Sequence, residues 1–452
     1  MTNAVQNQTS ASIEIDALAG KAVKALEVMK TLTQEQVDKI AKAMSEAGVS
    51  NERHLAEFAV EETGMGNVED KVMKNHFASQ VVYDYMKHAK SVGIISEQDG
   101  IVEIAEPYGV VAAVTPTTNP TSTTIFKSLV ALKGRNVIIF GFHPRAQKCS
   151  AAAAKIMHDA AVAAGAPKNC IQWIEKPSVK ATDALMTHKD VSIIIATGGA
   201  AMVKAAYSSG HPALGVGPGG VPVYIEKSAN LDRAIADVIA SKTLDYGTIC
   251  AADQSVIFDD RGTAKKALEL FEQEGAYIAT EEEKGKLEKV MFDKERGVPS
   301  MAIVGQSPQV IGKLAGIDIP ADRKLILVPL TTTSGGDWMS HEKLSPVLGW
   351  YVAANSDEAI QAAQSQLQFG GAGHTAAVFT NSEDIAMKFA QKVDASRVMW
   401  NQPAVHGALG ALCNSLVPSL TLGCGAKGGN ITGVNVSYKE LLNVKRLARR
   451  TS

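Results

Sequence analysis

The sequence predicts an α/β protein with two lobes, each built on a mostly parallel sheet that helices cover on both faces. The chain has 452 residues, more than one hydrophobic core usually serves, so we expect two or three lobes. Short apolar runs of strand length alternate with stretches of helix length, a pattern typical of parallel sheets. Hydrophobic residues make up 46% and charged residues 20% of the chain, which favours a globular protein.

The first ninety residues have the pattern of helices. Apolar residues recur at helical spacing over 13–29, and the pattern continues over 51–58 and 75–86. Thr33 followed by Gln36 predicts a capping box before a further helix. The segment 95–107 then alternates polar and apolar residues, with a turn at Asp99-Gly100, and predicts paired strands.

Two α/β alternations follow, and they set the expected domain boundaries. In the first, we expect strands at 110–114, 136–140, 171–174 and 191–196, and helices at 124–132, 150–164 and 179–186. In the second, we expect elements at 221–227, 232–244, 255–258, 264–274, 301–304, 325–328, 357–366 and 375–380. The expected domains are 1–225, 226–423 and a C-terminal segment 424–452, whose part 431–436 is strand-like.

Charge and composition exclude several classes of function. With 45 basic and 47 acidic residues the formal net charge is -2, which leaves no electrostatic footprint for nucleic acid or an anionic membrane. No apolar run approaches the roughly 20 residues that span a bilayer, and the polar segment 1–12 predicts no secretory signal. Five scattered cysteines without CxxC or HExxH spacing do not support disulfides or a zinc site. We therefore expect a cytoplasmic protein without a metal.

Cys250 is the cysteine with the most reactive setting. It lies in YGTICAADQS, between a predicted helix and a predicted strand, with a glycine and two alanines nearby. Such a turn can leave room for a substrate carbonyl and can aim backbone N–H groups at an oxyanion. An isolated cysteine is more often a packing residue, and Cys149 and Cys170 fit that interpretation.

Other candidate residues are ambiguous when taken alone. Asn119 in TPTTNP is either a turn former or an oxyanion donor that the flanking prolines hold in place. Glu342 in SHEKLSPVL and His374 in GGAGHTA are, by themselves, a solvated charge and a hydrogen-bonded filler. The string GVGPGG at 215–220 matches a dinucleotide-binding glycine pattern, but Pro222 and a predicted strand follow it. We therefore expect close-packed loop backbone there.

Taken together, these strings resemble the aldehyde dehydrogenase superfamily, and most closely its CoA-acylating branch. That branch includes ethanolamine- and propanediol-utilisation aldehyde dehydrogenases, CoA-dependent succinate-semialdehyde dehydrogenase and the N-terminal half of bifunctional aldehyde–alcohol dehydrogenase. The resemblance runs from about residue 13 to the end and implies two Rossmann-like domains with a small β arm for oligomerisation. The matching strings are EETGMGNVEDKVMKN, EPYGVVAAVTPTTNP, HPRA, ATGGAAMVKAAYSSG, GVGPGG, YGTICAADQSV, HEKLSPVL, GAGHTA and TLGCGAKGGN.

The resemblance implies a role for each matching residue. Cys250 corresponds to the nucleophile, and Asn119 with the backbone N–H of Cys250 to the oxyanion site. Glu342 corresponds to the glutamate that holds the nicotinamide ribose. The implied cofactor is NAD, with NADP as the alternative. Further positions that correspond to cofactor-binding loops are Thr115, Pro116, His143, Pro144, Arg145, Thr197, Gly198, Gly199, Gly217 and Pro218.

The resemblance also favours coenzyme A as the acyl acceptor. Hydrolytic relatives carry a glutamate in the loop that corresponds to 215–220, and this loop has no carboxylate. Glu226 lies beyond the loop, and we expect it at the surface. Because water attack needs a positioned base, thiolysis by CoA is the expected second half-reaction. His374 is the candidate for moving the CoA thiol proton.

The leading hypothesis is a reversible oxidoreductase that converts acetaldehyde, CoA and NAD⁺ to acetyl-CoA and NADH. Propionaldehyde, sulfoacetaldehyde and succinate semialdehyde are alternative substrates, and a hydrolytic dehydrogenase is the alternative enzyme. A catalytically silent member of the same fold is the alternative from another class. The resemblance further implies a homodimer or tetramer, joined through 101–106 and 431–436.

Overall fold

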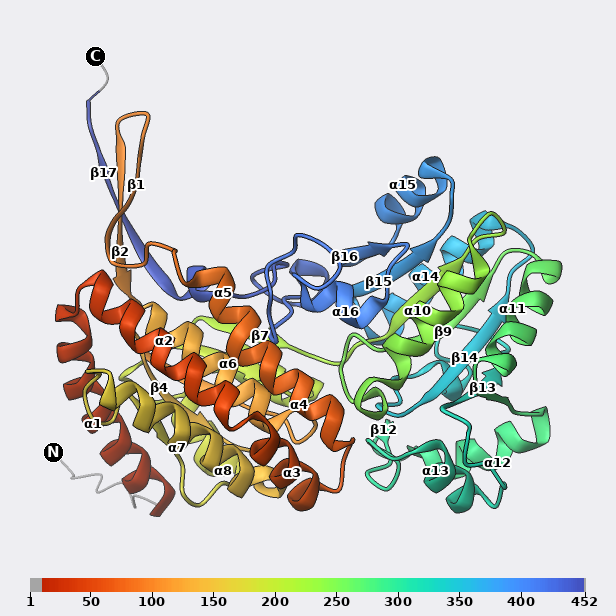
Figure 1. Cartoon of the computed structure of the whole chain (residues 1–452), viewed down its shortest axis with the longest axis horizontal. Helices are drawn as coiled ribbons and strands as arrows, with labels where there is room; N and C mark the ends of the chain where they lie inside the picture. Colours follow the sequence, from red (N-terminus) through yellow and green to blue (C-terminus); the bar gives the residue numbers. More distant parts are fainter. Residues whose placement is uncertain (1–9, 451–452) are drawn as a thin grey trace, which may run out of the picture.

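In the computed structural model, which describes residues 10–450, two parallel sheets form two lobes and an antiparallel sheet forms an arm (Figure 1). The predicted α/β class is therefore confirmed. Most of the segment 1–12, on which the expectation about a secretory signal rests, lies outside the described residues. Within the described part of the chain, no helix is long and apolar enough to cross a membrane.

The first lobe is built on strands that are apolar on both faces. Its strands are β3 (Val110–Val114), β4 (Val137–Gly141), β5 (Ile171–Trp173), β6 (Val191–Thr197) and β7 (Ala213–Val216). They are parallel, in the order β5-β4-β3-β6-β7, and are called the first sheet below. Every residue of β3 and β4 is buried, as expected where helices cover both faces.

Helices enclose this sheet. The connecting helices are α6 (Pro120–Lys133), η2 (Pro144–Ala146), α7 (Gln147–Ala163), α8 (Val179–Met186) and α9 (Ala200–Tyr207). The preceding ones are α1 (Ser10–Thr31), α2 (Gln34–Ser50), α3 (Glu52–Thr63), α4 (Val68–His76), the π-helical turn η1 (Phe77–Val81) and α5 (Val82–Met86). α2 packs on α6 and α7, whereas α1 packs on α8 and β4. The capping box at Thr33 and Gln36 is confirmed.

The second lobe contains the second sheet. Its strands are β8 (Val221–Ile225), β9 (Asp253–Phe258), β10 (Ala276–Ile278), β13 (Leu325–Pro329), β14 (Val347–Val352), β15 (Gly373–Phe379) and β16 (Ala395–Trp400). Their order is β10-β13-β14-β9-β8-β15-β16, and all pairs are parallel. The other elements are α10 (Leu231–Thr243), η3 (Leu244–Gly247), α11 (Arg261–Gln273), α12 (Glu281–Met291), β11 (Phe292–Asp293), β12 (Val298–Pro299), α13 (Pro308–Ala315), η4 (Trp338–Ser340), α14 (Ser356–Gly370), α15 (Glu383–Lys392), α16 (Ala404–Leu409) and η5 (Ala426–Gly428). The later turn η6 (Tyr438–Leu441) packs on α6 of the first lobe.

Two expectations about this lobe need correction. β8 pairs with β9 and β15, so the expected boundary at 225 falls one strand late and the chain changes lobes in the loop 217–220. The segment 301–304 forms turns rather than a regular element. Its apolar residues Ile303 and Val304 are buried because the turn packs beneath α13 and β13 in one apolar cluster.

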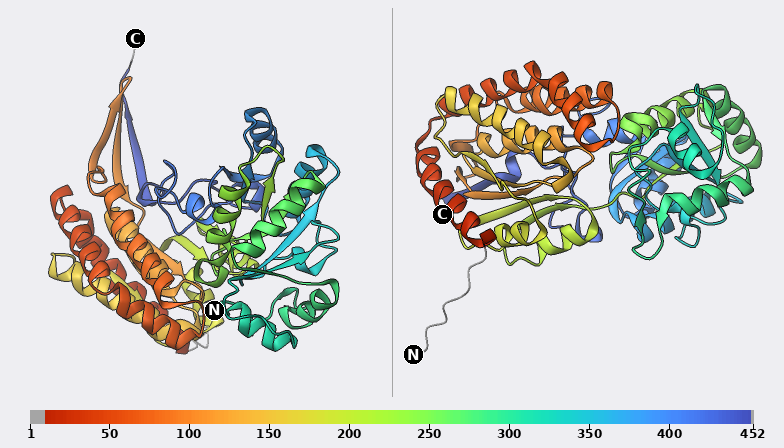
Figure 2. Two further views of the ribbon diagram at one scale, coloured as in Figure 1. Left: turned by 45° about the vertical axis from the view of Figure 1, so that its right-hand side comes forward. Right: turned by 90° about the horizontal axis from the view of Figure 1, so that it is seen from below.

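The arm consists of β1 (Gly93–Gln98), β2 (Ile101–Pro107) and β17 (Leu442–Ala448), and it projects from the first lobe (Figures 1 and 2). The predicted turn is confirmed, with φ of 50° at Asp99 and 76° at Gly100. β17 runs antiparallel to β2 along its whole length. The expected strand at 431–436 is wrong, because that segment makes only the isolated bridge between Leu422 and Asn435.

Candidate active site

The predicted residues gather where the carboxyl edge of the first sheet meets the amino edge of the second. Thr115 and Pro116 directly follow β3, His143 follows β4, and Thr197 ends β6. Open parallel sheets bind ligands at this carboxyl edge. Gly217 follows β7 and begins the loop that leads into the second lobe.

Three strands of the second sheet begin at the same place. Cys250 lies just before β9, the glycine loop 217–220 just before β8, and His374 at the start of β15. A Cβ on Gly219 would lie 1.8 Å from the carbonyl oxygen of Cys250, and a Cβ on Gly220 only 3.0 Å from the carbonyl carbon of Gly370. The loop backbone is therefore close-packed, and a side chain at either position would displace the backbone around Cys250 or His374.

Cys250 and His374 are in direct contact. The Cys250 Sγ lies 3.1 Å from His374 Nε2, and His374 Nδ1 lies 3.0 Å from the Thr375 Oγ1. His374 is fully buried, whereas the Cys250 side chain is partly accessible. A tautomer with the proton on Nδ1 donates to Thr375 and leaves Nε2 free to accept the thiol proton.

Both members of this pair are uncharged at neutral pH. Burial raises the pKa of the Cys250 thiol to about 12, Glu342 and Cys424 add to the rise, and Arg397 opposes it. Burial lowers the pKa of His374 to about 3, and the charge of Arg397 lowers it further. A neutral imidazole beside a neutral thiol can accept the proton as the sulfur attacks, which is the Cys–His form of nucleophile activation.

Asn119 approaches the loop that carries Cys250 from the first lobe. It is the N-terminal cap residue of α6, and its side chain does not cap the helix. Its Nδ2 donates to the Thr118 Oγ1 at 3.0 Å and to the carbonyl oxygen of Thr248 at 3.4 Å. Thr248 is two residues before Cys250, so the carboxamide lies next to the loop that carries Cys250.

Glu342 contacts the glycine loop. Its Oε1 accepts a 2.8 Å hydrogen bond from the Gly219 N–H. Burial raises the pKa of Glu342 to about 7, although the Gly219 N–H, Lys242 and Lys343 oppose the rise. The group is therefore a carboxyl that changes its charge near neutral pH beside the backbone of the glycine loop.

The expected cofactor positions contain unsatisfied polar atoms. The Thr115 Oγ1 and Thr197 Oγ1 are buried without a hydrogen-bond partner, and a buried hydroxyl without a partner is costly unless a ligand or water contacts it. The N-terminus of α9 has no side-chain cap at Gly199. A cavity of about 460 Å³ lies alongside, lined by Gly217, Pro218, Cys424 and residues of α9. A separate groove of about 500 Å³ between α11 and β14 contains none of these residues.

The other cofactor-loop positions have local structural roles. His143 accepts a hydrogen bond from the Arg145 N–H and caps η2, while Pro144 and Arg145 are exposed. Glu62, which the sequence does not single out, accepts from the N–H groups of Lys148 and Cys149 at 2.9 and 2.7 Å. A carboxylate therefore occupies the N-terminus of α7, where it is favoured by the helix dipole.

Two further charged residues have places that the sequence does not reveal. Arg397 is buried beneath the site and donates to the carbonyl oxygens of His374 and Gly433 at 3.1 and 3.2 Å. Glu226 is buried rather than at the surface, so that expectation is wrong. It accepts from the Ser228 N–H at 3.0 Å and the Thr380 Oγ1 at 2.9 Å, which satisfies a carboxylate at the end of β8.

Known proteins resemble this chain over most of its length. A profile of the aldehyde dehydrogenase family matches residues 2–281. Aldehyde-alcohol dehydrogenase 2 of Entamoeba histolytica is 48% identical over 96% of this chain and 51% of its own length, so the chain spans about half of that relative. Succinate-semialdehyde dehydrogenase (acetylating) of Clostridium kluyveri is 38% identical over 97% of this chain and 96% of its own length.

Solved structures share the fold over nearly the whole chain. An acetylating aldehyde dehydrogenase from Geobacillus thermoglucosidasius is 45% identical, with a TM-score of 0.95, over 98% of this chain and 97% of that one. A propionaldehyde dehydrogenase from Rhodopseudomonas palustris, solved with bound CoA and an acylated cysteine, is 26% identical, with a TM-score of 0.86, over 96% of this chain and 97% of that one. The chain therefore belongs to the aldehyde dehydrogenase family, in its CoA-acylating branch.

The raised pKa of Glu342 predicts a pH-dependent effect on stability. Between pH 4.5, the ordinary pKa, and about pH 7, the folded protein holds the Glu342 proton more often than the unfolded chain does. The unfolding free energy therefore falls as the pH rises through this range. We expect Glu342→Gln to raise the unfolding free energy at pH 8 by on the order of 1–3 kcal/mol and to change it little at pH 5. Thermal unfolding of both proteins at the two pH values measures this.

Glu226→Gln is the matched control, because the buried Glu226 carboxylate accepts hydrogen bonds from Ser228 and Thr380. Its loss should lower the unfolding free energy at both pH values. Equal stability of Glu342→Gln and the unsubstituted protein at pH 8 would contradict the account.

Proposed function

We propose that this protein catalyses the reversible oxidation of a short-chain aldehyde to its acyl-CoA, with NAD as hydride acceptor and Cys250 as the covalent nucleophile. The observation that carries the proposal is the 3.1 Å contact between the Cys250 Sγ and His374 Nε2. A thiol in contact with a buried neutral imidazole is an arrangement for nucleophilic attack, and it occurs where the two sheets meet.

The first half-reaction uses four groups of the chain, three on side chains and one on the backbone. The thiol proton passes to His374 Nε2 as the sulfur of Cys250 bonds to the aldehyde carbon. Asn119 Nδ2 and the backbone N–H of Cys250 hold the developing oxyanion. A bound NAD⁺ would supply the hydride acceptor for that carbon. The chain is left with a thioester on Cys250, and the thiol proton is released.

The residues at the carboxyl edge of the first sheet fit a dinucleotide. Thr115 and Thr197 offer the buried hydroxyls that lack protein partners, and the uncapped N-terminus of α9 can accept a phosphate. Glu62 supports NAD rather than NADP, because its carboxylate already accepts from the N–H groups at the start of α7. A 2′-phosphate near that helix end would face a like charge.

Coenzyme A fits the second half-reaction. The loop 215–220 supplies no side-chain base for water, whereas a CoA thiolate, once formed, attacks without such a base, and His374 or solvent takes the thiol proton. The proton of CoA then returns to the Cys250 sulfur as the thioester is transferred. Lys204 and Lys427 line the adjacent cavity and can attract phosphates. The structure of the Rhodopseudomonas palustris relative, with bound CoA and an acylated cysteine, supports the same order of reaction steps.

Acetaldehyde is the substrate that the relatives favour. The relatives that match at 48% and 45% identity are an aldehyde-alcohol dehydrogenase and an acetylating aldehyde dehydrogenase. The relative that acts on succinate semialdehyde is 38% identical. The free thiols of all five cysteines support a reducing, cytoplasmic location.

A hydrolytic dehydrogenase is the second candidate, and one observation favours it. Glu342 contacts Gly219, whose backbone packs against Cys250, and its pKa is raised to about 7. A carboxyl with that pKa can act as a general base toward water. In the leading proposal this group instead holds the nicotinamide ribose, which would cover it during turnover.

The nucleophile is tested by replacing one cysteine at a time. We expect Cys250→Ala to lower NADH formation by at least roughly a thousandfold, because the variant lacks the sulfur on which the proposed thioester forms. Cys149→Ala is the control, since Cys149 is buried and burial raises its pKa, and it should keep most of the activity. Substantial turnover by Cys250→Ala would rule out the assignment.

The acyl acceptor is tested by omitting CoA. We expect a burst of about one NADH per active site, as for an accumulating acyl-enzyme, followed by a rate lower than with CoA by on the order of a hundredfold or more. Stopped-flow absorbance measures both phases. Many rapid turnovers to free carboxylate without CoA would favour the hydrolytic candidate, and their loss in Glu342→Gln would identify its base.

The exposed strands of the arm predict that the protein forms a homo-oligomer. Ile94 on β1 and Leu447 on β17 are each 57% exposed, and both outer strands of the arm leave an edge unpaired, which favours pairing with a second copy. We expect a homodimer or tetramer by light scattering, and a monomer for Ile94→Glu with Leu447→Glu. Val179→Glu, an exposed apolar residue on α8, should leave the mass unchanged. A monomeric mass of the unsubstituted protein at micromolar concentration would refute assembly.

A further inference from the structure

The orientation of the Asn119 carboxamide is fixed by a buried lysine. The Lys74 Nζ donates to the Asn119 Oδ1 at 2.5 Å, while Nδ2 donates to the Thr118 Oγ1 and the Thr248 carbonyl oxygen. An ammonium group has only donors. A flipped carboxamide would therefore place its own donors against the Lys74 ammonium, so Lys74 selects the orientation in which Nδ2 faces the nucleophile loop.

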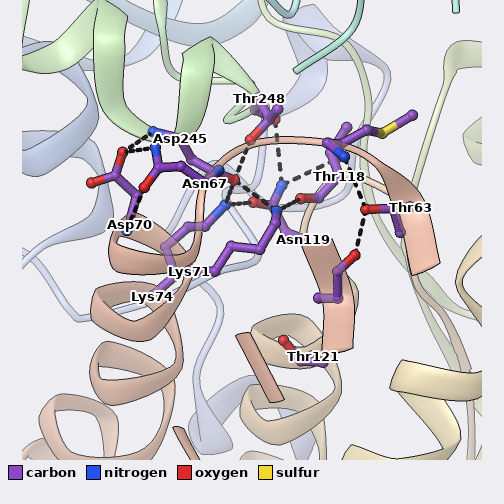
Figure 3. Close-up of polar contacts among 12 residues, drawn as sticks. Thr63, Asn67, Asp70, Lys71, Lys74, Thr118, Asn119, Thr121, Asp245 and Thr248 are labelled. Carbon is purple, nitrogen blue, oxygen red and sulfur yellow. Dashed lines mark hydrogen bonds and ion pairs between the residues drawn. The ribbon is translucent and has the colours of Figure 1, made fainter. Parts of the chain in front are cut away.

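Lys74 is itself held by a carboxylate from the other lobe. Lys74 and Lys71, both on α4, form ion pairs with the Oδ2 of Asp245, the latter at 2.9 Å (Figure 3). All three side chains are buried, with at most 2% exposed. The Lys71 Nζ also donates to the carbonyl oxygen of Thr118 at 3.1 Å. The two lysines thus bridge the turn that carries Asn119 and the segment that leads to Cys250.

The backbone at Asp245 adopts a strained conformation that encloses the Asp245 carboxylate. Asp245 and Tyr246 have φ of 49° and 52°, a left-handed conformation that costs energy in residues other than glycine. Asp245 accepts from the Asn67 N–H at 2.9 Å and the Thr248 Oγ1 at 2.7 Å. A Cβ on Gly66 would lie 1.9 Å from its Oδ1. Such enclosure holds Lys74 in one place.

The charges around Lys74 keep it a cation at neutral pH. Burial lowers the pKa of Lys74 to about 8, Asp245 opposes this, and Lys71 adds to it. Asp70 on the same helix also raises it, and the Thr118–Asn119 turn contributes only neutral groups. Although burial opposes it, Lys74 and Lys71 hold the pKa of Asp245 below its usual value. A buried cation on the amide oxygen also polarises the carboxamide and strengthens its N–H groups as donors.

We propose that Lys74, anchored by Asp245 and Lys71, is a positioning residue for the oxyanion site. It orients the Asn119 carboxamide and strengthens Nδ2 as a donor to the oxyanion that forms on the substrate. The 3.4 Å bond from Nδ2 to Thr248 is long and is the one that an incoming oxyanion replaces. This inference rests on the proposed function, in which Asn119 is an oxyanion donor.

A double-mutant cycle in the full-length protein tests the proposal. We expect Asn119→Ala to lower kcat on the order of a hundredfold or more, and Lys74→Met to lower it roughly ten- to a hundredfold with little change in KM for the aldehyde. If Lys74 acts through Asn119, adding Lys74→Met to Asn119→Ala changes kcat by no more than about twofold. Stopped-flow hydride transfer without CoA isolates the acylation step.

Lys133→Met is the matched control for losing a buried lysine that pairs with a carboxylate. Lys133 is fully buried, pairs with Asp38 and ends the helix that Asn119 begins, roughly 20 Å away. It should change kcat by no more than about twofold. If Lys74→Met does not fold, as judged by thermal unfolding, Lys74→Gln replaces it in the cycle, because it keeps a polar group beside Asp245 without the charge.

The outcomes are distinguishable. Full kcat in the Lys74 variant, or losses that multiply in the double variant, would overturn the positioning role while leaving Asn119 as a donor. Full kcat in Asn119→Ala would overturn the oxyanion assignment itself, and the inference with it.

Discussion

The contact between Cys250 and His374 depends on what lies between them. In the second sheet β8 separates β9, which follows Cys250, from β15, which begins at His374. Two strands apart corresponds to about 10 Å between backbones. The side chains meet across the loop just before the middle strand, where Gly219 and Gly220 stand, and added Cβ atoms there would strike the Cys250 carbonyl and the backbone of Gly370. The glycine loop is thus the constraint that allows the pair to form.

The charged side chains near the site contact the reacting atoms only through neutral groups. Cys250 and His374 are neutral because burial disfavours their ionised forms. The permanent charges act through neutral groups, since Arg397 donates to the His374 carbonyl and Lys74 to the Asn119 amide. In the proposed mechanism, this arrangement places donors where negative charge develops and places no strong counter-ion against the Cys250 thiol.

Local patterns predicted most of the fold, and they failed where polar residues carry structure. Fully apolar runs such as β3 and β4 were identifiable because both faces are buried. β17 was missed because LNVKRLA is mostly exposed. Its partners are charged, with Arg446 and Lys445 paired to Glu103 and Glu106. The assignment of β8 to the second sheet depends on pairing across the chain, which no local pattern contains.

The residues of the candidate site also divide into those that local sequence patterns predict and those that they do not. Cys250, Asn119 and His374 stand in strings with recognisable neighbours, and the fold brings them together. Lys71 and Lys74, three residues apart, have the spacing of an exposed basic helix face, and Asp245 lies 171 positions from Lys74. Their burial arises only when the lobes meet, so the sequence alone gave no reason to connect them with Asn119.

The central claim is that an acyl group resides on Cys250 between the two half-reactions. Peptide mass mapping after mixing the protein with acetaldehyde and NAD⁺, without CoA, tests it directly. The account predicts an acetyl group on the peptide that contains Cys250, at close to one per chain, which disappears when CoA is added and reappears as acetyl-CoA. An unmodified Cys250 peptide despite NADH formation, or an acetyl group on another cysteine, would contradict it.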